Sequence, residues 1–150
     1  MIILSKLADY GVIVATHLAA FPDHQITAGA VAAATRLPQA TVAKLLKSLA
    51  HAGLVVATRG ASGGYRLARE RRRISLGDIV RTVRGLETTE DPIGDPAGSA
   101  LGHLIVRPVW LDLQEEMMGR LDSLTLDDLC ARAHRAGISG RTTECTDFEI

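Results

Sequence analysis

The stretch Leu54-Val-Val-Ala-Thr58-Arg59-Gly-Ala-Ser-Gly-Gly64-Tyr65-Arg-Leu-Ala68 decides the fold. Two short runs of β-forming residues, Leu54–Thr58 and Tyr65–Ala68, flank a loop rich in glycine, and this pattern predicts a β-hairpin. The loop lacks the Gly-Lys-Ser/Thr ending of a phosphate-binding loop, and no helix follows it, so the pattern excludes a P-loop nucleotide site.

Three predicted helices precede the hairpin. Residues 5–20 carry an apolar stripe at helical spacing. Thr27 is placed to cap a short helix that reaches about Thr35, and Leu37-Pro38 opens a third helix that Gly53 ends. Three helices followed by a hairpin is the order of elements in a winged helix-turn-helix.

Two further helices are predicted after the hairpin, on either side of a long one. Ser75-Leu-Gly-Asp78 forms a capping box for a fourth helix, and Thr125-Leu-Asp-Asp128 caps a last helix to about Arg135. Between them, residues 87–103 show no periodicity and predict a long loop. A long helix is expected to start between His103 and Arg107. Its apolar residues recur at steps of three and four: Val106, Trp110, Leu113, Met117, Leu121 and Leu124. This spacing fits a two-helix seam between subunits and equally a helix packed on its own core.

The charges of the chain are divided between its two halves. Residues 1–85 carry 12 Lys and Arg against 4 Asp and Glu, whereas residues 86–150 carry 5 against 13. The net charge of zero therefore describes neither half. A basic half indicates a polyanion as partner, although a chance distribution of solvated surface charge gives the same count.

The exposed face of the third helix and the hairpin loop are the candidate nucleic-acid contacts. The helix shows a polar and basic strip, which consists of Gln39, Thr41, Lys44, Lys47, Ser48 and His51. Such side chains supply donors for base edges and phosphates, but most polar helix faces are simply solvated. At the loop, Arg59 and Ser62 are placed to reach a minor groove or phosphates, and a plain tight turn is the alternative. Residues 69–73 are expected to form a solvated loop, with a secondary phosphate contact as the alternative.

No catalytic or metal-binding pattern emerges, and we do not expect an enzyme. The five histidines are scattered, and His17 is expected to pack beside the first apolar stripe. Cys130 and Cys145 are too few for a disulfide framework; we expect Cys130 to be buried, and Cys145 could be reactive. The longest uncharged apolar run, residues 10–21, is shorter than the ~20 residues of a membrane span. A cytoplasmic protein is expected.

The sequence closely resembles the Rrf2 (Rrf-two) family of bacterial transcription regulators. The resemblance rests on Ser5-Lys-Leu-Ala-Asp-Tyr-Gly11, Ala52-Gly-Leu-Val55 and above all the hairpin Arg59–Ala68, and it covers about residues 1–130. Ile74-Ser-Leu-Gly-Asp-Ile79, Val106-Arg-Pro-Val-Trp110 and Leu124-Thr-Leu-Asp-Asp-Leu129 extend it. The first and the Trp110 stretches are most similar to the branch that regulates SUF-type iron–sulfur cluster assembly.

The resemblance implies a cytoplasmic homodimer that binds a pseudo-palindromic operator. Each subunit would place its third helix in a major groove and its wing in the adjacent minor groove. The residues at the family's DNA-contact positions are Lys6, Gln39, Thr41, Lys44, Arg59 and Ser62. The long helix would form the dimer interface through Val106, Trp110, Leu113, Met117 and Leu121.

The chain departs from the family in one respect. Cluster-binding members carry three cysteines in the loop before the long helix, and here Thr89–Leu104 contains none. Asp91, Ala97 or Gly98, and Leu104 stand near the ligand positions, and Asp91 with His103 cannot replace three thiolates. No cofactor is therefore predicted, and no metal ligands are assigned.

We therefore predict a mainly α chain with a winged helix-turn-helix, a small β-hairpin wing and a long C-terminal dimerisation helix. Residues 1–85 are expected to bind DNA, 86–103 to form a sensor-type loop, 104–136 to form the dimerisation helix and a short last helix, and 137–150 a flexible tail. We expect a DNA-binding regulator of iron–sulfur cluster assembly or of related iron and redox genes, and we expect it to act as a repressor. The alternatives are a cluster-free regulator that responds to a thiol or small ligand, for example through Cys145, and an adaptor that binds protein and no longer reads DNA.

Overall fold

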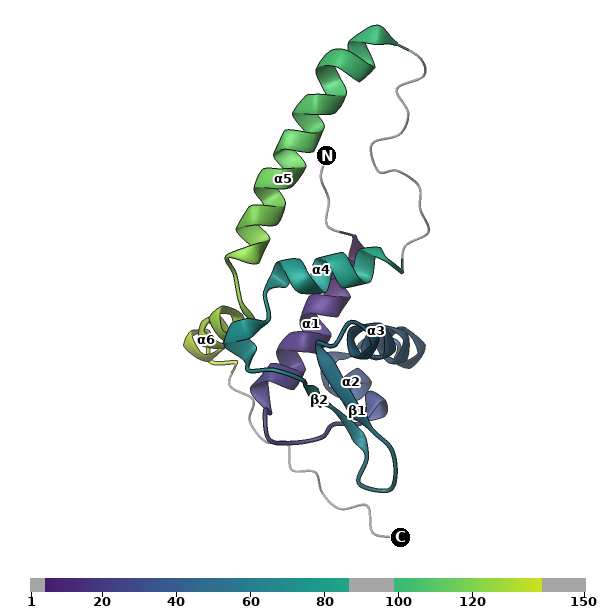
Figure 1. Cartoon of the computed structure of the whole chain (residues 1–150). Coiled ribbons are helices and arrows are strands. Elements are labelled where there is room, and N and C mark those ends of the chain that lie inside the picture. Colours follow the sequence, from purple (N-terminus) through teal and green to yellow (C-terminus); the bar gives the residue numbers. More distant parts are fainter. Residues whose placement is uncertain (1–4, 87–98, 139–150) are drawn as a thin grey trace.

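The computed structural model of the chain describes residues 5–86 and 99–138. It shows a helical body with a small two-stranded wing, from which one long helix projects (Figure 1). The elements in chain order are α1 (Lys6–Ala20), α2 (Ala28–Thr35), α3 (Gln39–His51), β1 (Val55–Thr58), β2 (Gly64–Leu67), the 3₁₀ turn η1 (Arg71–Arg73), α4 (Leu76–Arg84), the π-helical turn η2 (Gly102–Val106), α5 (Arg107–Asp122) and α6 (Leu126–Arg135). The predicted fold class, a mainly α winged helix-turn-helix, is confirmed.

The predicted cap at Thr27 and the predicted helix end at Gly53 are present, and Ser5 also caps α1. The side chain of Ser5 accepts a hydrogen bond from Ala8 N at 3.1 Å, and that of Thr27 accepts one from Ala30 N at 3.2 Å. After α3, Gly53 takes up a φ of 75°, a left-handed conformation in which glycine carries no steric cost. Local sequence therefore fixes the starts of α1 and α2 and the end of α3.

Helix α1 lies at the centre of the body and contacts α2, α3, α4, α6 and β2. Leu18 on α1, Leu45 on α3 and Ile79 on α4 are fully buried in the shared core. At Gly11 the helices approach so closely that an added Cβ would lie 2.7 Å from Val83 Cγ2 on α4. The core therefore requires a glycine where α1 meets α4.

The wing is an antiparallel pair in which Val55 faces Leu67 and Thr58 faces Gly64. A third segment supports it, because the backbone of Tyr65 exchanges hydrogen bonds with Ile26 at 2.8 and 2.9 Å. A Cβ on Gly64 would lie 2.9 Å from the Ile26 backbone, and one on Gly63 would lie 2.4 Å from Thr58 O. These two glycines are therefore needed for close backbone approach. The bridge to Ile26 was not predicted.

Helices α4 and α6 begin side by side. The predicted capping box of α4 is present, with Asp78 bonded back to Ser75, and the predicted cap Thr125 forms a second capping box with Asp128. The two cap residues also face each other in an antiparallel bridge, in which Leu76 N donates to Leu124 O at 2.8 Å. The segment that follows the long helix is thereby attached to the start of α4.

The solvated loop expected at residues 69–73 differs in the structure. Arg71–Arg73 form the turn η1, and Arg71 Nε pairs with Asp127 Oδ1 of α6 at 2.7 Å. The three arginines are nevertheless exposed. The ordering comes from a partner more than fifty residues away in the sequence, which composition alone does not reveal.

The long helix starts earlier than predicted. Helical backbone begins at residue 100, before the expected His103–Arg107 start, and passes through η2 into α5. Ser99 helps to begin it, since His103 N donates to Ser99 O at 3.1 Å. Residues 87–98, which hold most of the cysteine-free loop, and residues 139–150, which hold Cys145, lie outside the described residues.

The apolar face of α5 is divided between two environments. Leu121 is buried in the core of the body, and Met117 packs against that core. Farther along, Val106, Trp110 and Leu113 are 43%, 39% and 42% exposed. Packing against the residues that the structure describes therefore accounts only for the last turns of α5.

Candidate nucleic-acid interface

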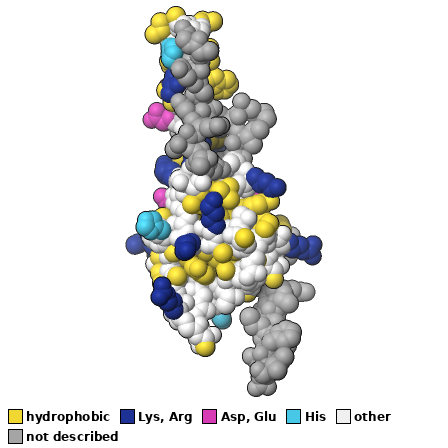
Figure 2. Space-filling model, turned by 90° about the vertical axis from the view of Figure 1, so that its right-hand side faces the viewer, with side chains coloured by type: hydrophobic (Ala, Val, Ile, Leu, Met, Phe, Trp, Pro, Cys, Tyr) yellow, Lys and Arg dark blue, Asp and Glu magenta, His cyan; other side chains and the backbone are white. Residues whose placement is uncertain are grey.

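A continuous stretch of the body carries positive charge without any acid. Residues 24–69, which include α2, α3 and the wing, contain six Lys and Arg and no Asp or Glu. Figure 2 shows this side of the molecule, where Lys and Arg spread over the body and the visible Asp and Glu lie higher, toward α5. The stretch 24–69 therefore gives α2, α3 and the wing an excess of positive charge.

Helix α3 presents the polar strip on this face. Val42, Leu45, Leu46 and Leu49 are buried, which leaves Gln39, Lys44 and Lys47 exposed and Thr41 half-buried. Pro38, the N-cap residue, makes no side-chain cap, so the first N–H groups of the helix stay open to a ligand or water. The Gln39 amide nitrogen lies beside α2, 3.6 Å from the position of a Cβ on Gly29.

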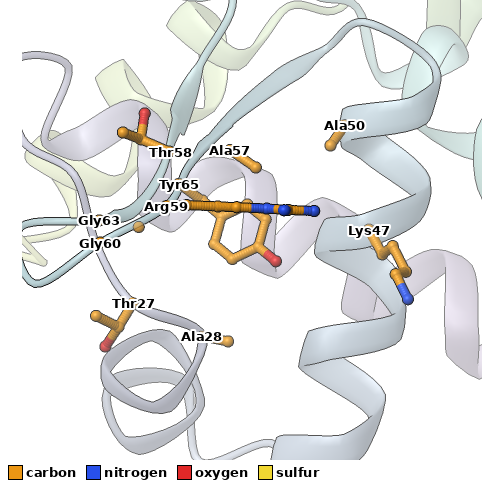
Figure 3. A pocket seen from close by; sticks show the side chains of 11 residues that line it. Thr27, Ala28, Lys47, Ala50, Ala57, Thr58, Arg59, Gly60, Gly63 and Tyr65 are labelled. Carbon is orange, nitrogen blue, oxygen red and sulfur yellow. The ribbon is translucent and has the colours of Figure 1, made fainter.

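The wing turn places Arg59 and Ser62 on the surface, and both are exposed. Figure 3 shows the Arg59 side chain extended from the wing toward α3, the helix that carries Lys47. No described carboxylate forms an ion pair with Arg59, Lys44 or Lys47. The three positive charges are therefore available to an anionic partner.

A hollow opens between the N-terminus of α2, the C-terminal half of α3 and the wing (Figure 3). Arg59 and Lys47 supply its charges, and the half-buried Tyr65 supplies a hydroxyl. Small residues make up most of the remaining wall, which consists of Thr27, Ala28, Ala50, Ala57, Thr58, Gly60, Gly63 and Gly64. The sequence placed Lys47 on the polar strip but did not bring it to the wing, and it gave Tyr65 no role beyond its strand.

The predicted contact residues therefore fall into three places. Gln39, Thr41 and Lys44 share α3, and Arg59 and Ser62 share the wing. Lys6 lies apart from both, at the start of α1 and at the opposite end of the body from the wing turn (Figure 1). Its ammonium group lies 5.7 Å from the centroid of the Tyr10 ring.

His17 and Cys130 lie outside this face, and each is half-buried in the helical body. His17 is half-buried with its ring edge-to-face on Phe21 at 5.3 Å, and burial lowers its pKa. Burial raises the pKa of the half-buried Cys130 thiol, an effect that nearby Arg71 opposes. A raised pKa lowers the fraction of reactive thiolate, so these surroundings do not activate Cys130.

The donor set of the chain does not fit the three-thiolate cluster of cluster-binding relatives. The whole chain has two cysteines, and neither lies in the loop before the long helix. Within residues 5–86 and 99–138, no three His, Cys, Asp or Glu side chains are grouped as metal ligands. Among these same residues, no helix is long and apolar enough to cross a membrane.

Comparisons with known proteins agree with this geometry. The family model described as Rrf2, iron-dependent transcriptional regulator, matches residues 4–132. The transcriptional repressor NsrR of Streptomyces coelicolor is 35% identical over 109 residues, which cover 73% of this chain and 74% of NsrR.

Two solved structures share the fold. IscR of T. potens has a TM-score of 0.70 at 32% identity, with 88% of each chain covered. CymR of B. subtilis, the global cysteine regulator, has a TM-score of 0.68 at 31% identity, with 88% of this chain and 98% of CymR covered. The family and its structural neighbours are transcriptional regulators and not enzymes. The chain therefore belongs to the Rrf2 family of winged-helix, DNA-binding transcriptional regulators.

Proposed function

We propose that the chain is a repressor that binds a pseudo-palindromic operator as a homodimer. The observation that carries this proposal is the face without acids, on which α3 and the wing carry exposed Lys44, Lys47 and Arg59. Phosphate attraction supplies much of the affinity of DNA-binding proteins, and a helix of these dimensions fits the major groove. The name of NsrR, a repressor, supports the direction of regulation.

Each part of the face has a proposed task. The N-terminal half of α3 lies in the major groove, where Gln39, Thr41 and Lys44 meet base edges and flanking phosphates. The wing follows the adjacent minor groove, with Arg59 and Ser62 at its edge. Lys6, which is separate from both, contacts a phosphate from the N-terminus of α1. Residues 1–85 are thus the DNA-binding unit.

The projecting helix is the proposed dimer interface, within residues 104–136. Its outer part exposes large apolar side chains in succession, and Leu104 is 73% exposed. Exposed apolar surface of this extent marks an interaction site, and the steps of three and four residues fit a second copy of the same helix. The interface is formed by Val106, Trp110 and Leu113, with Met117 at its inner border, whereas Leu121 serves the core of its own subunit.

The proposed target genes are those of iron–sulfur cluster assembly or related iron and redox metabolism. The description of the family, iron-dependent regulation, supports this class. Because the cysteine set does not fit a cluster, the signal reaches this regulator by another route, such as a small ligand or a partner protein. The protein acts in the cytoplasm, where its DNA is.

A reporter assay tests repression and target class together. Sites recovered by selection from a random duplex pool are placed between a promoter and a reporter gene, with and without the chain. We expect lower reporter output with the chain present, and genomic copies of the site upstream of iron or redox genes. Unchanged output would contradict repression, and copies near unrelated genes would contradict the target class. Failure of any DNA to be enriched would favour the adaptor.

A further inference from the structure

If the function proposed above is correct, the shape of DNA determines what passes through the hollow between α3 and the wing. Neighbouring major and minor grooves of a duplex are separated by one sugar-phosphate strand. If α3 occupies the major groove and the wing the adjacent minor groove, that strand must pass through the gap between them. The hollow in Figure 3 is that gap.

The lining of the hollow has the chemistry of a phosphate site. Lys47 contributes an ammonium group from α3 and Arg59 a guanidinium group from the wing, so cations approach from two sides. None of the described residues that line it is acidic. Small side chains at Ala28, Ala50 and Ala57 leave the space open. A phosphate group would therefore meet positive charge from both walls without steric obstruction.

The wing is bonded to the segment before α2, and α2 in turn packs against α3, so the elements around the hollow are held in fixed relation to one another. Tyr65 lines the hollow with its side chain, while its backbone is bonded in both directions to Ile26, just before α2. Ile26 and Thr27 in turn lead into α2, whose N-terminus borders the same hollow at Ala28. A preformed site of this kind loses little entropy when it binds its ligand.

We propose that the hollow binds one phosphodiester group of the strand that separates the two grooves, through Lys47, Arg59 and the Tyr65 hydroxyl. Because a phosphate carries no base identity, these residues contribute affinity and register, and base selection lies with the first half of α3. Lys47 and Tyr65 thus join the DNA contacts, and Arg59 is assigned to the backbone at the groove edge.

The test combines protein variants with single neutral phosphates in the DNA. Each phosphate of a selected half-site is replaced in turn by a methylphosphonate, which removes its charge. Binding of the full-length chain and of Lys47→Gln is then measured on every duplex. We expect Lys47→Gln to weaken binding roughly tenfold or more on unmodified DNA. The slope of the logarithm of the binding constant against the logarithm of the salt concentration should become smaller by about one for each subunit.

The position of the effect decides the outcome. At one phosphate, the methylphosphonate should weaken wild-type binding, and Lys47→Gln, Arg59→Gln and Tyr65→Phe should each lose less than wild type at that same phosphate, because one of the groups that bind its charge is already gone. Smaller losses at different phosphates for the Lys47 and Arg59 variants, or losses equal to those of wild type at every position, would overturn the shared site. Arg120→Gln, an exposed cation on α5, is the matched control and should behave as wild type at every phosphate. If the wild-type chain selects no DNA sequence at all, the proposed function itself fails, which is a distinct result.

Discussion

Arg81 of α4 and Asp122 at the end of α5 form a two-pronged ion pair. One guanidinium nitrogen donates to Asp122 Oδ1 at 2.7 Å and the other to Oδ2 at 2.5 Å. The pair stands over Gly77, where an added Cβ would lie 1.8 Å from Asp122 Oδ1. A glycine at this position therefore allows the base of the projecting helix to be bonded to α4 of the helical body.

Gly77→Ala should loosen that attachment. The new methyl group displaces the Asp122 carboxylate and separates it from Arg81. Because exposed ion pairs contribute little to global stability, the melting temperature should change only slightly. Amide hydrogen exchange at the last turn of α5 should become faster, whereas exchange in α1 stays as in wild type. Unchanged exchange at both places would show that the pair does not hold the helix.

Gly11→Ala should destabilise the core. Its methyl group would lie 2.7 Å from Val83 Cγ2, at a contact between α1 and α4 where both residues are buried. Overpacking of this kind costs about 1–3 kcal/mol in the free energy of unfolding, measured by urea denaturation. Gly119→Ala on α5 is the control, since no atom lies within 4 Å of its added Cβ. The control should gain about 0.5–1 kcal/mol from helix propensity, and equal losses in both variants would refute the packing argument.

The exposed face of α5 should control the oligomeric state. Trp110→Glu places a charge in the proposed seam and should convert a dimer into a folded monomer, as measured by sedimentation equilibrium. Operator affinity should fall with it, because one half-site then binds alone. Glu116→Gln changes an exposed side chain on the same helix and should remain dimeric. A dimeric Trp110→Glu protein would place the interface elsewhere.

His17 should make stability depend on pH below neutrality. Burial lowers its pKa in the folded state from the ordinary value of 6.5, so the unfolded chain binds the proton more readily. The contribution of His17 to the free energy of unfolding is therefore constant above pH 6.5. It decreases as the pH falls from 6.5 through the pKa of the folded state. His17→Gln should lose that decrease, as followed by urea titration between pH 5 and 7. A parallel pH profile in the two proteins would contradict burial as the cause.

Gln39→Ala should change which sequences are bound more than how tightly DNA is bound. A bidentate amide contact to a base discriminates by about 1–3 kcal/mol at one position of the site. Selection with this variant should therefore relax a single position in each half-site, while affinity for random DNA is retained. Lys47→Gln, in contrast, should lower affinity for all sequences alike. An unchanged selected site would remove Gln39 from base contact.

The elements whose limits depend on local chemistry could be predicted from the sequence. The caps at Ser5, Thr27, Ser75 and Thr125 are made by side chains that bond within three residues, so short motifs identify them. The wing motif is similarly informative, because its glycines lie so close to neighbouring backbone that a side chain would not fit. The features that escaped prediction depend on distant partners.

Ile26 illustrates the limit of such predictions. It bridges Tyr65 across almost forty residues, and nothing in its own neighbourhood signals a strand. Arg36, which ends α2 at a φ of 57°, lacks the glycine that would have marked this left-handed position. For the site, periodicity placed Lys47 on the correct face of α3, but its meeting with Arg59 and Tyr65 depends on how the wing folds back.

The most direct measurement of the central claim is selection by the full-length chain from a random duplex pool at near-physiological salt. We predict an enriched pseudo-palindrome whose half-sites are separated by one helical turn, about 34–36 Å, or a multiple of it, because two copies of α3 must enter major grooves on a shared dyad. Enrichment of a single half-site would contradict the dimer. No enriched sequence, with only weak salt-sensitive binding, would contradict specific DNA recognition by α3 and the wing.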